Sequence, residues 1–378
     1  MLTAPLRLGF YYFAAFAVIG IHMPFWPAWL AGKGLDSTAI GIVVASGVGI
    51  KVIANPIVAH FADKSGERRR IMLLLAVVAS VAFFTFTEVD RFWSILIMTM
   101  VFFACWSPIM PLAESLTMMT AEAQKLDYGR IRMWGSASFI GGAVLAGLVL
   151  SGRSSDLLPW LVLPALAFAV LSCATLPDGR APPIERGRFA VLELMKEKRF
   201  VLVLLAATCV QTSHAVYYSF GTIHWRTAGH SEAVIGMLWG ESVIVEVLLF
   251  AFGTRLVKRF GAGGLIVLAG LGGVVRWTGT ALGTHLGLLL AVQTLHALTF
   301  AAAHLGAIHL IARTVPPALS ASAQSLYSSI VMGLGLGVAL LFTGPLYGAQ
   351  GANAFYWMTG LAALGALLAW PLTKPAKP

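Results

Sequence analysis

Charged residues are scarce in this sequence. Only 11% of its 378 residues are charged, whereas soluble domains usually carry about 25%. Hydrophobic residues make up 58% of the chain, and the mean hydropathy is +0.83. A soluble protein of this composition would have too few polar residues to cover its surface. The scarcity of charge therefore excludes an ordinary soluble fold and indicates a chain whose main solvent is lipid.

Cysteine and metal-binding patterns are also nearly absent. The three cysteines, Cys105, Cys173 and Cys209, lie in apolar runs without metal-ligand spacing, so we expect small buried residues rather than disulfides or a zinc site. No spaced set of His, Asp and Glu suggests a metal centre or a catalytic nucleophile, and the loops are too short for a receptor domain. We expect no metal, no cofactor and no enzymatic activity.

The net charge of +10 could suggest nucleic-acid binding, but the basic residues do not gather on one tail or segment. The first apolar segment, 8–30, is too long for a signal peptide and has no small-residue cleavage site. Because a spanning helix needs about 20 apolar residues, we predict an all-α membrane protein of twelve spans, with no nucleic-acid partner. The predicted spans are 8–31, 39–62, 71–87, 92–119, 131–151, 157–176, 200–225, 231–256, 263–283, 286–312, 322–348 and 352–372.

The placement of Lys and Arg predicts the orientation of these spans. With both termini in the cytoplasm, 20 of the 26 basic residues fall in inside segments and 4 in outside loops. Such a bias is the pattern that positive residues follow in cytoplasmic loops. We therefore expect a multi-pass protein of the bacterial inner membrane, in contact with lipids and monomeric.

The longest loop divides the chain into two halves of six spans. We predict an N-terminal six-helix bundle over 1–176, a cytoplasmic linker over 177–199 and a C-terminal six-helix bundle over 200–378. The loop between spans 2 and 3, from Ala59 to Arg69, reads AHFADKSGERR. It resembles the signature loop of the major facilitator superfamily, although Ala59 replaces the first Gly and Glu67 replaces an Arg. This resemblance implies two pseudo-symmetric bundles with a central cavity.

Further segments resemble one branch of that superfamily, the 3-phenylpropionate transporter family, which is related to nucleoside–proton symporters and more distantly to lactose permease. The matching stretches occur in order over nearly the whole chain, and the most specific one is Leu126–Ser136 (LDYGRIRMWGS). The others are Gly20–Leu30, Ser107–Glu114, His214–Ser231, Val243–Ala251, Gly273–Trp277 and Gln293–Leu310. The resemblance implies a proton symporter that works by alternating access, without fixing its substrate.

Ionisable residues inside the spans are candidates for function, because a charge at the bilayer centre costs about 2.5–3.5 kcal/mol on insertion scales. Glu246 on span 8 and Arg276 on span 9 lie near mid-membrane on neighbouring helices, so we predict that they meet as an ion pair. Glu246 would carry the proton, and the distance of Arg276 would control its protonation. The alternative is a static bridge that only locks the two helices together.

His296 and His304 on span 10 complete the predicted coupling site. They are separated by Phe300 in an i, i+4, i+8 row and should share one helix face. This set resembles the coupling residues of lactose-permease-type symporters, which have a further acid on span 10. Here Phe300 occupies the position four residues after the histidine, so coupling would rest on Glu246 alone or together with Glu241.

Lys51 lies in the middle of span 2 without an acid at its depth. An unpaired cation at this place suggests that an anionic substrate is its partner; snorkelling and an unidentified partner are the alternatives. We expect the other substrate-binding groups on spans 1, 7 and 10, which line the cavity in the superfamily. They are His22, Trp26, Gln211, His214, Tyr218 and Gln293.

A charge network is predicted at the cytoplasmic ends of spans 2 to 5. It would close the inner gate, although ordinary solvated loop charges are the alternative. Its members are Asp63, Arg68, Glu114, Arg130 and Arg132. Together these features predict a proton-driven importer of a small organic solute, an aromatic carboxylate such as a phenylpropionate-like acid. A nucleoside or sugar symporter and a proton-driven efflux transporter are the alternatives.

Overall fold

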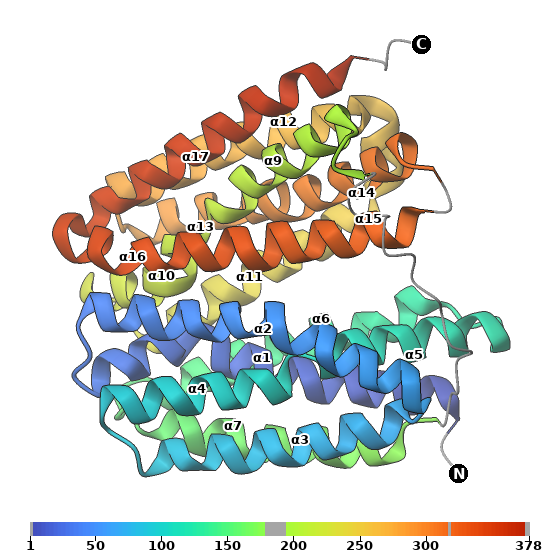
Figure 1. The fold of residues 1–378 in the computed structure, drawn as a ribbon. Helices are drawn as coiled ribbons and strands as arrows, with labels where there is room; N and C mark the ends of the chain where they lie inside the picture. Colours follow the sequence, from blue (N-terminus) through green and yellow to red (C-terminus); the bar gives the residue numbers. More distant parts are fainter. Residues whose placement is uncertain (1–2, 178–193, 317–318, 375–378) are drawn as a thin grey trace. The chain divides into compact units, whose positions relative to one another are not determined.

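The computed structural model describes residues 3–177, 194–316 and 319–374, and helices make up nearly all of this part of the chain (Figure 1). Eleven of its helical segments are long and apolar enough to span a membrane. The last of them, Ser322–Thr373, includes two helices that meet at Gly351, where φ is 54° and ψ is −127°. The segment thus corresponds to the last two predicted spans. The predicted all-α membrane fold is confirmed.

Contacts between Cα atoms divide the chain into two units. Unit 1 comprises Met1–Glu185 and Gly229–Gly240, and unit 2 comprises Arg186–Ala228 and Glu241–Pro378. The predicted boundaries at 176 and 199 stay a prediction, and residues 178–193 of the predicted linker lie outside the described part. Helix α11 (Glu232–Ala251) contributes its first turns to unit 1 and the remainder to unit 2.

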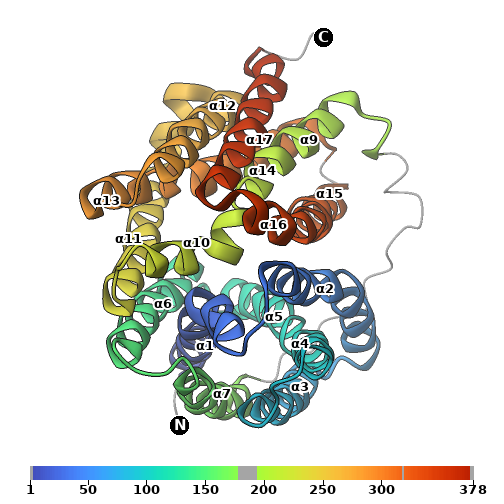
Figure 2. The same ribbon diagram turned by 90° about the vertical axis from the view of Figure 1, so that its left-hand side faces the viewer.

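Unit 1 is a bundle of helices that Figure 2 shows nearly end-on. Within it, α1 packs against α6 and α7, and α3 packs against α4 and α7. The close contact of α1 with α6 depends on Gly20, since a Cβ atom at this position would lie 2.5 Å from the carbonyl oxygen of Phe139. The helices are α1 (Ala4–Gly32), α2 (Ser37–Ser65), α3 (Arg68–Phe84), α4 (Phe92–Trp106), α5 (Ile109–Gln124), α6 (Tyr128–Leu150) and α7 (Leu157–Thr175).

Unit 2 is built around α12, which packs against α14 and α17. A kink at Gly261, where φ is 71°, divides α12 near its start. The spanning part of α12 therefore begins where the ninth span was predicted. The helices are α9 (Lys198–Thr212), α10 (Ala215–Thr227), α12 (Gly253–Leu282), α13 (Leu286–Thr294), α14 (Ala303–Thr314), α15 (Ser320–Tyr327), α16 (Leu336–Gln350) and α17 (Ala354–Ala369).

Local sequence explains where several helices begin and end. Asp36 accepts a hydrogen bond from the amide of Ala39 at the start of α2, and Asp127 accepts one from the amide of Arg130 at the start of α6. Short polar side chains at such positions satisfy amides that have no partner within the helix. Gly66 ends α2 with φ at 69°, a left-handed conformation that glycine adopts without steric cost.

Several spans have irregular helical geometry in their interior, and one of them is span 11, which contains the π-helical stretch η4 (Ser328–Gly335). Span 4 breaks between α4 and α5 at Ser107 and Pro108, and span 7 breaks between α9 and α10 at Ser213 and His214. In span 10, the π-helical turn η2 (Ala297–Ala302) joins α13 to α14. Such interruptions often mark functional sites, because they expose backbone groups and redirect side chains.

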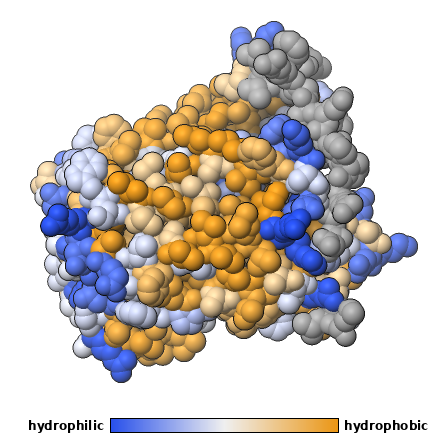
Figure 3. All heavy atoms as spheres, turned by 60° about the horizontal axis from the view of Figure 1, so that its bottom comes forward, coloured by the Kyte–Doolittle hydropathy of each residue, from blue (hydrophilic) through white to orange (hydrophobic). Residues whose placement is uncertain are grey.

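The outward-facing side chains are largely apolar. On the face drawn in Figure 3, hydrophobic residues form a broad middle zone, and hydrophilic residues lie at its two ends. Exposed side chains of α3 and α4 include Leu74, Val81, Trp93 and Ile97. A surface of this kind is suited to contact with lipid chains. It supports the assignment of a multi-pass membrane protein.

Candidate functional site

The most extensive buried polar network of the described residues surrounds Arg276 in unit 2. This side chain on α12 is fully buried. It donates hydrogen bonds to Nδ1 of His296 at 3.0 Å, to the hydroxyl of Thr299 at 2.9 Å and to Oε1 of Gln293 at 2.8 Å. Three hydrogen-bond acceptors around the guanidinium compensate for the hydration that its charge loses on burial.

Aromatic rings cover the Arg276 guanidinium as well. Its central carbon lies 4.9 Å from the ring centre of Tyr217 and 4.5 Å from that of Trp277. The Tyr217 hydroxyl accepts a hydrogen bond from Nε2 of Gln293 at 3.1 Å, which ties the ring to the same network. Cation–π contacts of this type strengthen where the charge is removed from water. Arg276 is thus held in one place from several sides.

His296 connects Arg276 with Glu246. A guanidinium can only donate hydrogen bonds, so Nδ1 of His296 must be the acceptor and the neutral ring carries its proton on Nε2. This Nε2 lies 3.6 Å from Oε2 of Glu246, whose side chain is 22% exposed. The direct ion pair expected between Glu246 and Arg276 is therefore replaced in the structure by an arrangement with an imidazole between the two charges.

The predicted polar stripe on span 7 lies beside this network. Nε2 of His214 is 3.0 Å from the hydroxyl of Thr299, and the His214 ring stacks on Tyr218 with centres 5.6 Å apart. Gln211 donates from Nε2 to the carbonyl oxygen of Phe300 at 3.3 Å. Gln211, His214 and Gln293 are buried and hydrogen-bonded, whereas Tyr218 is partly exposed.

The two span-10 histidines have different partners. The ring of His296 stacks on Phe300, four residues later, with centres 5.3 Å apart. Nδ1 of His304 lies 3.3 Å from the hydroxyl of Tyr327. The π-helical turn η2 lies between the two histidines and changes the helical spacing on which the predicted shared face relied.

The predicted substrate residues of unit 1 form a second cluster. The ammonium of Lys51 on α2 lies 4.8 Å from the ring centre of Phe103, and His22 lies 5.8 Å from the same ring, centre to centre. His22 stacks on Trp26 at 4.7 Å. Phe103 was missed by the sequence analysis, since only a contact could show that one ring touches both Lys51 and His22.

The predicted gate residues form separate pairs in unit 1. Arg68 binds Asp63 at 2.7 Å, and Arg132 binds Glu114 at 3.2 Å. Glu114 also accepts a hydrogen bond from the hydroxyl of Tyr128, a residue that the sequence analysis did not select. Arg130 follows the N-cap of α6, where its backbone amide donates to Asp127.

A charge cluster that the sequence analysis missed joins three loops of unit 1. The ammonium of Lys33 lies 2.6 Å from Asp90 and 3.0 Å from Asp156. The largest effect on Lys33, partial burial, lowers its pKa, but the hydrogen bonds with Asp90 and Asp156 outweigh it and raise the pKa overall. The hydrogen bond with Lys33 lowers the pKa of Asp156. All three positions fall in predicted outside loops. Their shared side of the membrane was the one feature of the sequence that could have indicated this cluster.

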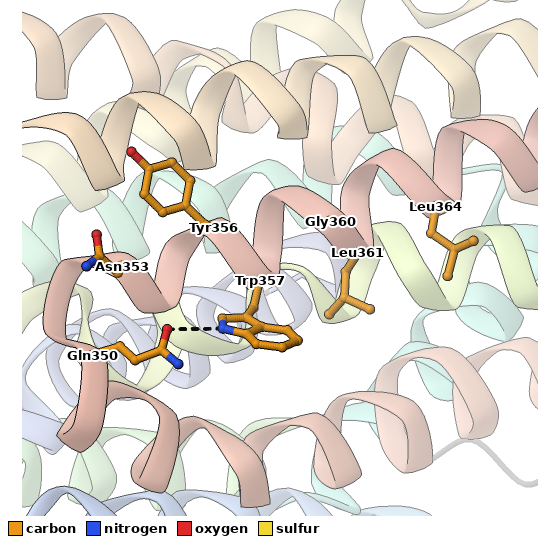
Figure 4. A pocket seen from close by; sticks show the side chains of 7 residues that line it. All are labelled: Gln350, Asn353, Tyr356, Trp357, Gly360, Leu361 and Leu364. Carbon is orange, nitrogen blue, oxygen red and sulfur yellow. Dashed lines mark hydrogen bonds between the residues drawn. The ribbon is translucent and has the colours of Figure 1, made fainter.

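A cavity of about 390 Å³ in unit 2 is lined by residues of α17, by the last residue of α16 and by the turn that joins the two helices (Figure 4). In its lining, the indole of Trp357 donates to Oε1 of Gln350 at 3.1 Å. Its other lining residues are Asn353, Tyr356, Gly360, Leu361 and Leu364. None of the predicted site residues belongs to this lining, so we do not assign the transport site to it.

Comparison with known proteins supports the family resemblance. The sequence model described as "MFS_1 like family" matches residues 6–358. A probable 3-phenylpropionic acid transporter of Escherichia coli (strain K12) is 33% identical, with 99% of this chain and 98% of that protein covered. A maltose permease of Geobacillus stearothermophilus is 26% identical, with 89% and 86% covered.

Solved structures share the fold at low sequence identity. The nucleoside transporter NupG, in its D323A mutant, matches with a TM-score of 0.89 at 16% identity over 98% of this chain and all of that one. A bacterial homologue of the lysosomal transporter Spinster matches with a TM-score of 0.73 at 14% identity, covering 98% and 93%. The fold is thus that of membrane transporters built from two six-helix bundles.

Proposed function

Because this chain belongs to the major facilitator superfamily, in its MFS_1 like family, we propose that it imports a small organic acid together with protons. The chain is a secondary transporter of small molecules and not an enzyme. An aromatic carboxylate is the proposed substrate. The resemblance to a probable 3-phenylpropionic acid transporter over nearly the full length of both chains supports this choice.

The observation that carries the proton-coupling proposal is the chain of contacts Glu246–His296–Arg276. The partly exposed carboxylate of Glu246 faces the Nε2–H of a neutral imidazole, and the guanidinium of Arg276 lies on the other side of that ring. Protonation of Glu246 removes the negative charge that faces this Nε2–H and that balances the charge of Arg276 across the ring. The proton on Glu246 and the position of Arg276 are therefore linked through His296.

The other predicted residues take supporting roles in this proposal. Gln293 and His214 orient the Arg276 network through their hydrogen bonds, and Gln211 and Tyr218 border it. His304, which contacts the hydroxyl of Tyr327, would relay the proton of Glu246 in this proposal. The pairs Asp63–Arg68 and Glu114–Arg132, together with Arg130, would act at the cytoplasmic end, with both termini in the cytoplasm of a bacterial cell.

Transport in vesicles tests the coupling. Glu246→Gln should still exchange labelled 3-phenylpropionate across the membrane but should no longer accumulate it against its gradient when a proton gradient is applied. Glu241→Gln should accumulate it like the wild type if Glu246 alone carries the proton. The exposed residue Glu122 on α5 offers a control, since Glu122→Gln removes one carboxylate outside the site. Uphill accumulation by Glu246→Gln would refute the assignment.

The direction of transport needs its own measurement. Right-side-out vesicles energised with an inward proton gradient should take up the acid, because symport moves both solutes inward. Everted vesicles that accumulate the acid under the physiological gradient would instead establish efflux.

A further inference from the structure

Lys51 is a cation inside a span for which the structure provides no acidic partner among the described residues. Its ammonium contacts the face of Phe103. Asp63, on the same helix as Lys51, binds Arg68, and Glu114 on the neighbouring helix α5 binds Arg132. A ring face compensates only part of the cost of a charge in the membrane. The charge of Lys51 therefore calls for an anion from outside the protein.

The groups next to Lys51 add hydrogen-bond donors. Asn55 lies one turn further along α2, and its Oδ1 accepts a hydrogen bond from the Ser107 hydroxyl at 2.7 Å. The amide oxygen of Asn55 is thus already used, while its NH₂ group can still donate. Ser107 lies at the break between α4 and α5.

The neighbouring aromatic side chains carry buried donors as well. The indole Nε1 of Trp26, which can only donate, is buried without an acceptor, and Nε2 of His22 is buried without a partner. Trp26 is 4% and His22 8% exposed. A buried donor without an acceptor costs about 1–3 kcal/mol. A ligand that carries acceptor oxygens would remove this cost.

We propose that Lys51, Asn55, Phe103 and His22 bind the carboxylate and the adjoining ring of an aromatic carboxylic acid. The inference rests on the proposed import function and names the substrate subsite for it. Lys51 and the Asn55 amide meet the carboxylate, which only accepts hydrogen bonds. The substrate ring packs against Phe103 and His22, whose rings already favour edge-to-face contact with each other at 73°. Trp26 stacks on His22, and its indole Nε1–H is a further donor for the carboxylate.

This set of groups disfavours a neutral sugar or nucleoside. Hydroxyl-rich ligands need acceptors as well as donors, and a half-buried ammonium without a counter-charge would remain beside them. Lys51, Asn55 and Trp26 offer donors. The described part of unit 1 places no carboxylate within ion-pair distance of Lys51.

Equilibrium binding to the purified full-length protein tests the proposal without a proton gradient. The probes are 3-phenylpropionate, its uncharged analogue 3-phenylpropanamide and the saturated analogue 3-cyclohexylpropionate. Wild type should bind 3-phenylpropionate about tenfold to hundredfold more tightly than the amide, because a charged hydrogen-bonded pair is lost with the latter. Lys51→Met should lose this preference, Lys51→Arg should keep most of it, and Lys196→Met at an exposed site should behave as wild type.

A second variant tests the ring contact. Phe103→Leu should reduce the preference for 3-phenylpropionate over 3-cyclohexylpropionate while keeping the preference for acid over amide. The exposed Phe84 provides a control in Phe84→Leu. Thermal melting of each variant checks that it is folded.

The outcomes separate this proposal from the proposed function. If Lys51→Met binds 3-phenylpropionate as the wild type does, the Lys51 subsite is wrong while the coupling role of Glu246 stands. If the wild type binds neither carboxylate, both the subsite and the aromatic-acid substrate are wrong. If binding follows the prediction but Glu246→Gln still accumulates substrate uphill, the subsite stands and the coupling residue is wrong.

Discussion

Arg276 donates a hydrogen bond to Nδ1 of His296 at 3.0 Å, and this contact fixes which nitrogen of the histidine carries the proton. The opposite nitrogen, Nε2, then presents its N–H toward Glu246 at 3.6 Å. A neutral imidazole in this orientation links a cation that cannot lose its proton to a carboxylate that can. The roles of the two ring nitrogens follow from the chemistry of the guanidinium.

His296→Leu should uncouple transport, because leucine can neither accept from Arg276 nor donate to Glu246. Substrate-driven proton uptake in vesicles should be lost, while exchange of substrate persists. His296→Gln has one acceptor and two donors on its amide and should retain part of the coupling. A static structural bridge would make no such distinction: both variants would then keep the ratio of proton to substrate flux at the wild-type value.

Arg276→Lys should destabilise the protein even though it preserves the charge. A lysine cannot reproduce the three directed hydrogen bonds to His296, Thr299 and Gln293, nor the flat contact with two rings. We expect a loss of about 2 kcal/mol, seen as a decrease in the thermal unfolding midpoint. Arg313→Lys, at an exposed position on α14, serves as control and should leave the midpoint unchanged.

Much of the fold could be predicted from the sequence because long apolar runs are a strong signal. The twelve intervals correspond to the helices of the structure, and the prediction ended span 8 too late only because residues 253–260 form a separate helical segment before the kink at Gly261. The break at Ser213 and His214 was not predicted. Neither residue is a strong helix breaker, so the position of this break depends on tertiary contacts.

The sequence could predict which polar residues lie inside the spans of unit 2, but not how their side chains contact one another. The sequence placed Glu246, Arg276 and His296 at similar depth on spans 8 to 10. It could not show that His296 lies between the two charges, because that depends on the rotation of each helix. The π-helical turn after His296 has no simple sequence signal, and Thr299 and Tyr217 join the network only through contacts across the unit.

The loop cluster of unit 1 predicts a dependence of stability on pH. Because the folded-state pKa of Asp156 is lowered through Lys33, its stabilisation is complete above the unfolded-state pKa, near 3.9, and is lost as the pH falls through the folded value. The folded-state pKa of Lys33 is raised. The stabilisation that Lys33 contributes is therefore complete below its unfolded-state pKa, near 10.4, and is lost as the pH rises through its folded-state pKa. The contribution of Lys33 and Asp156 to the free energy of unfolding should stay constant between roughly pH 5 and 9.

Thermal unfolding of the wild type, Asp156→Asn and Lys33→Met from acidic to alkaline pH checks this prediction. Asp156→Asn should lower the midpoint near neutrality, and its difference from wild type should shrink in acid. The difference between Lys33→Met and wild type should shrink at both extremes. A difference that is independent of pH for both variants would show that the ion pairs contribute nothing, as is common for exposed pairs.

Gly20→Ala and Gly141→Ala test whether close helix packing stabilises unit 1. Both are helix-forming substitutions, which alone favour the helix by up to about 1 kcal/mol. At position 20, however, the added Cβ would lie 2.5 Å from the Phe139 carbonyl oxygen on α6, whereas at position 141 it would meet nothing within 4 Å. Backbone atoms cannot move aside like the end of a flexible side chain, so α1 and α6 must separate, at a cost of about 1–3 kcal/mol.

We therefore expect the unfolding midpoint to fall for Gly20→Ala and to stay constant or rise for Gly141→Ala. Lipid offers no hydrophobic force that would bring the two helices back together, so burial elsewhere does not compensate for the weaker van der Waals packing between them. If both alanine variants were equally stable, the α1–α6 interface would be looser than the structure shows, and the position of His22 and Trp26 on the same helix would depend on other neighbours.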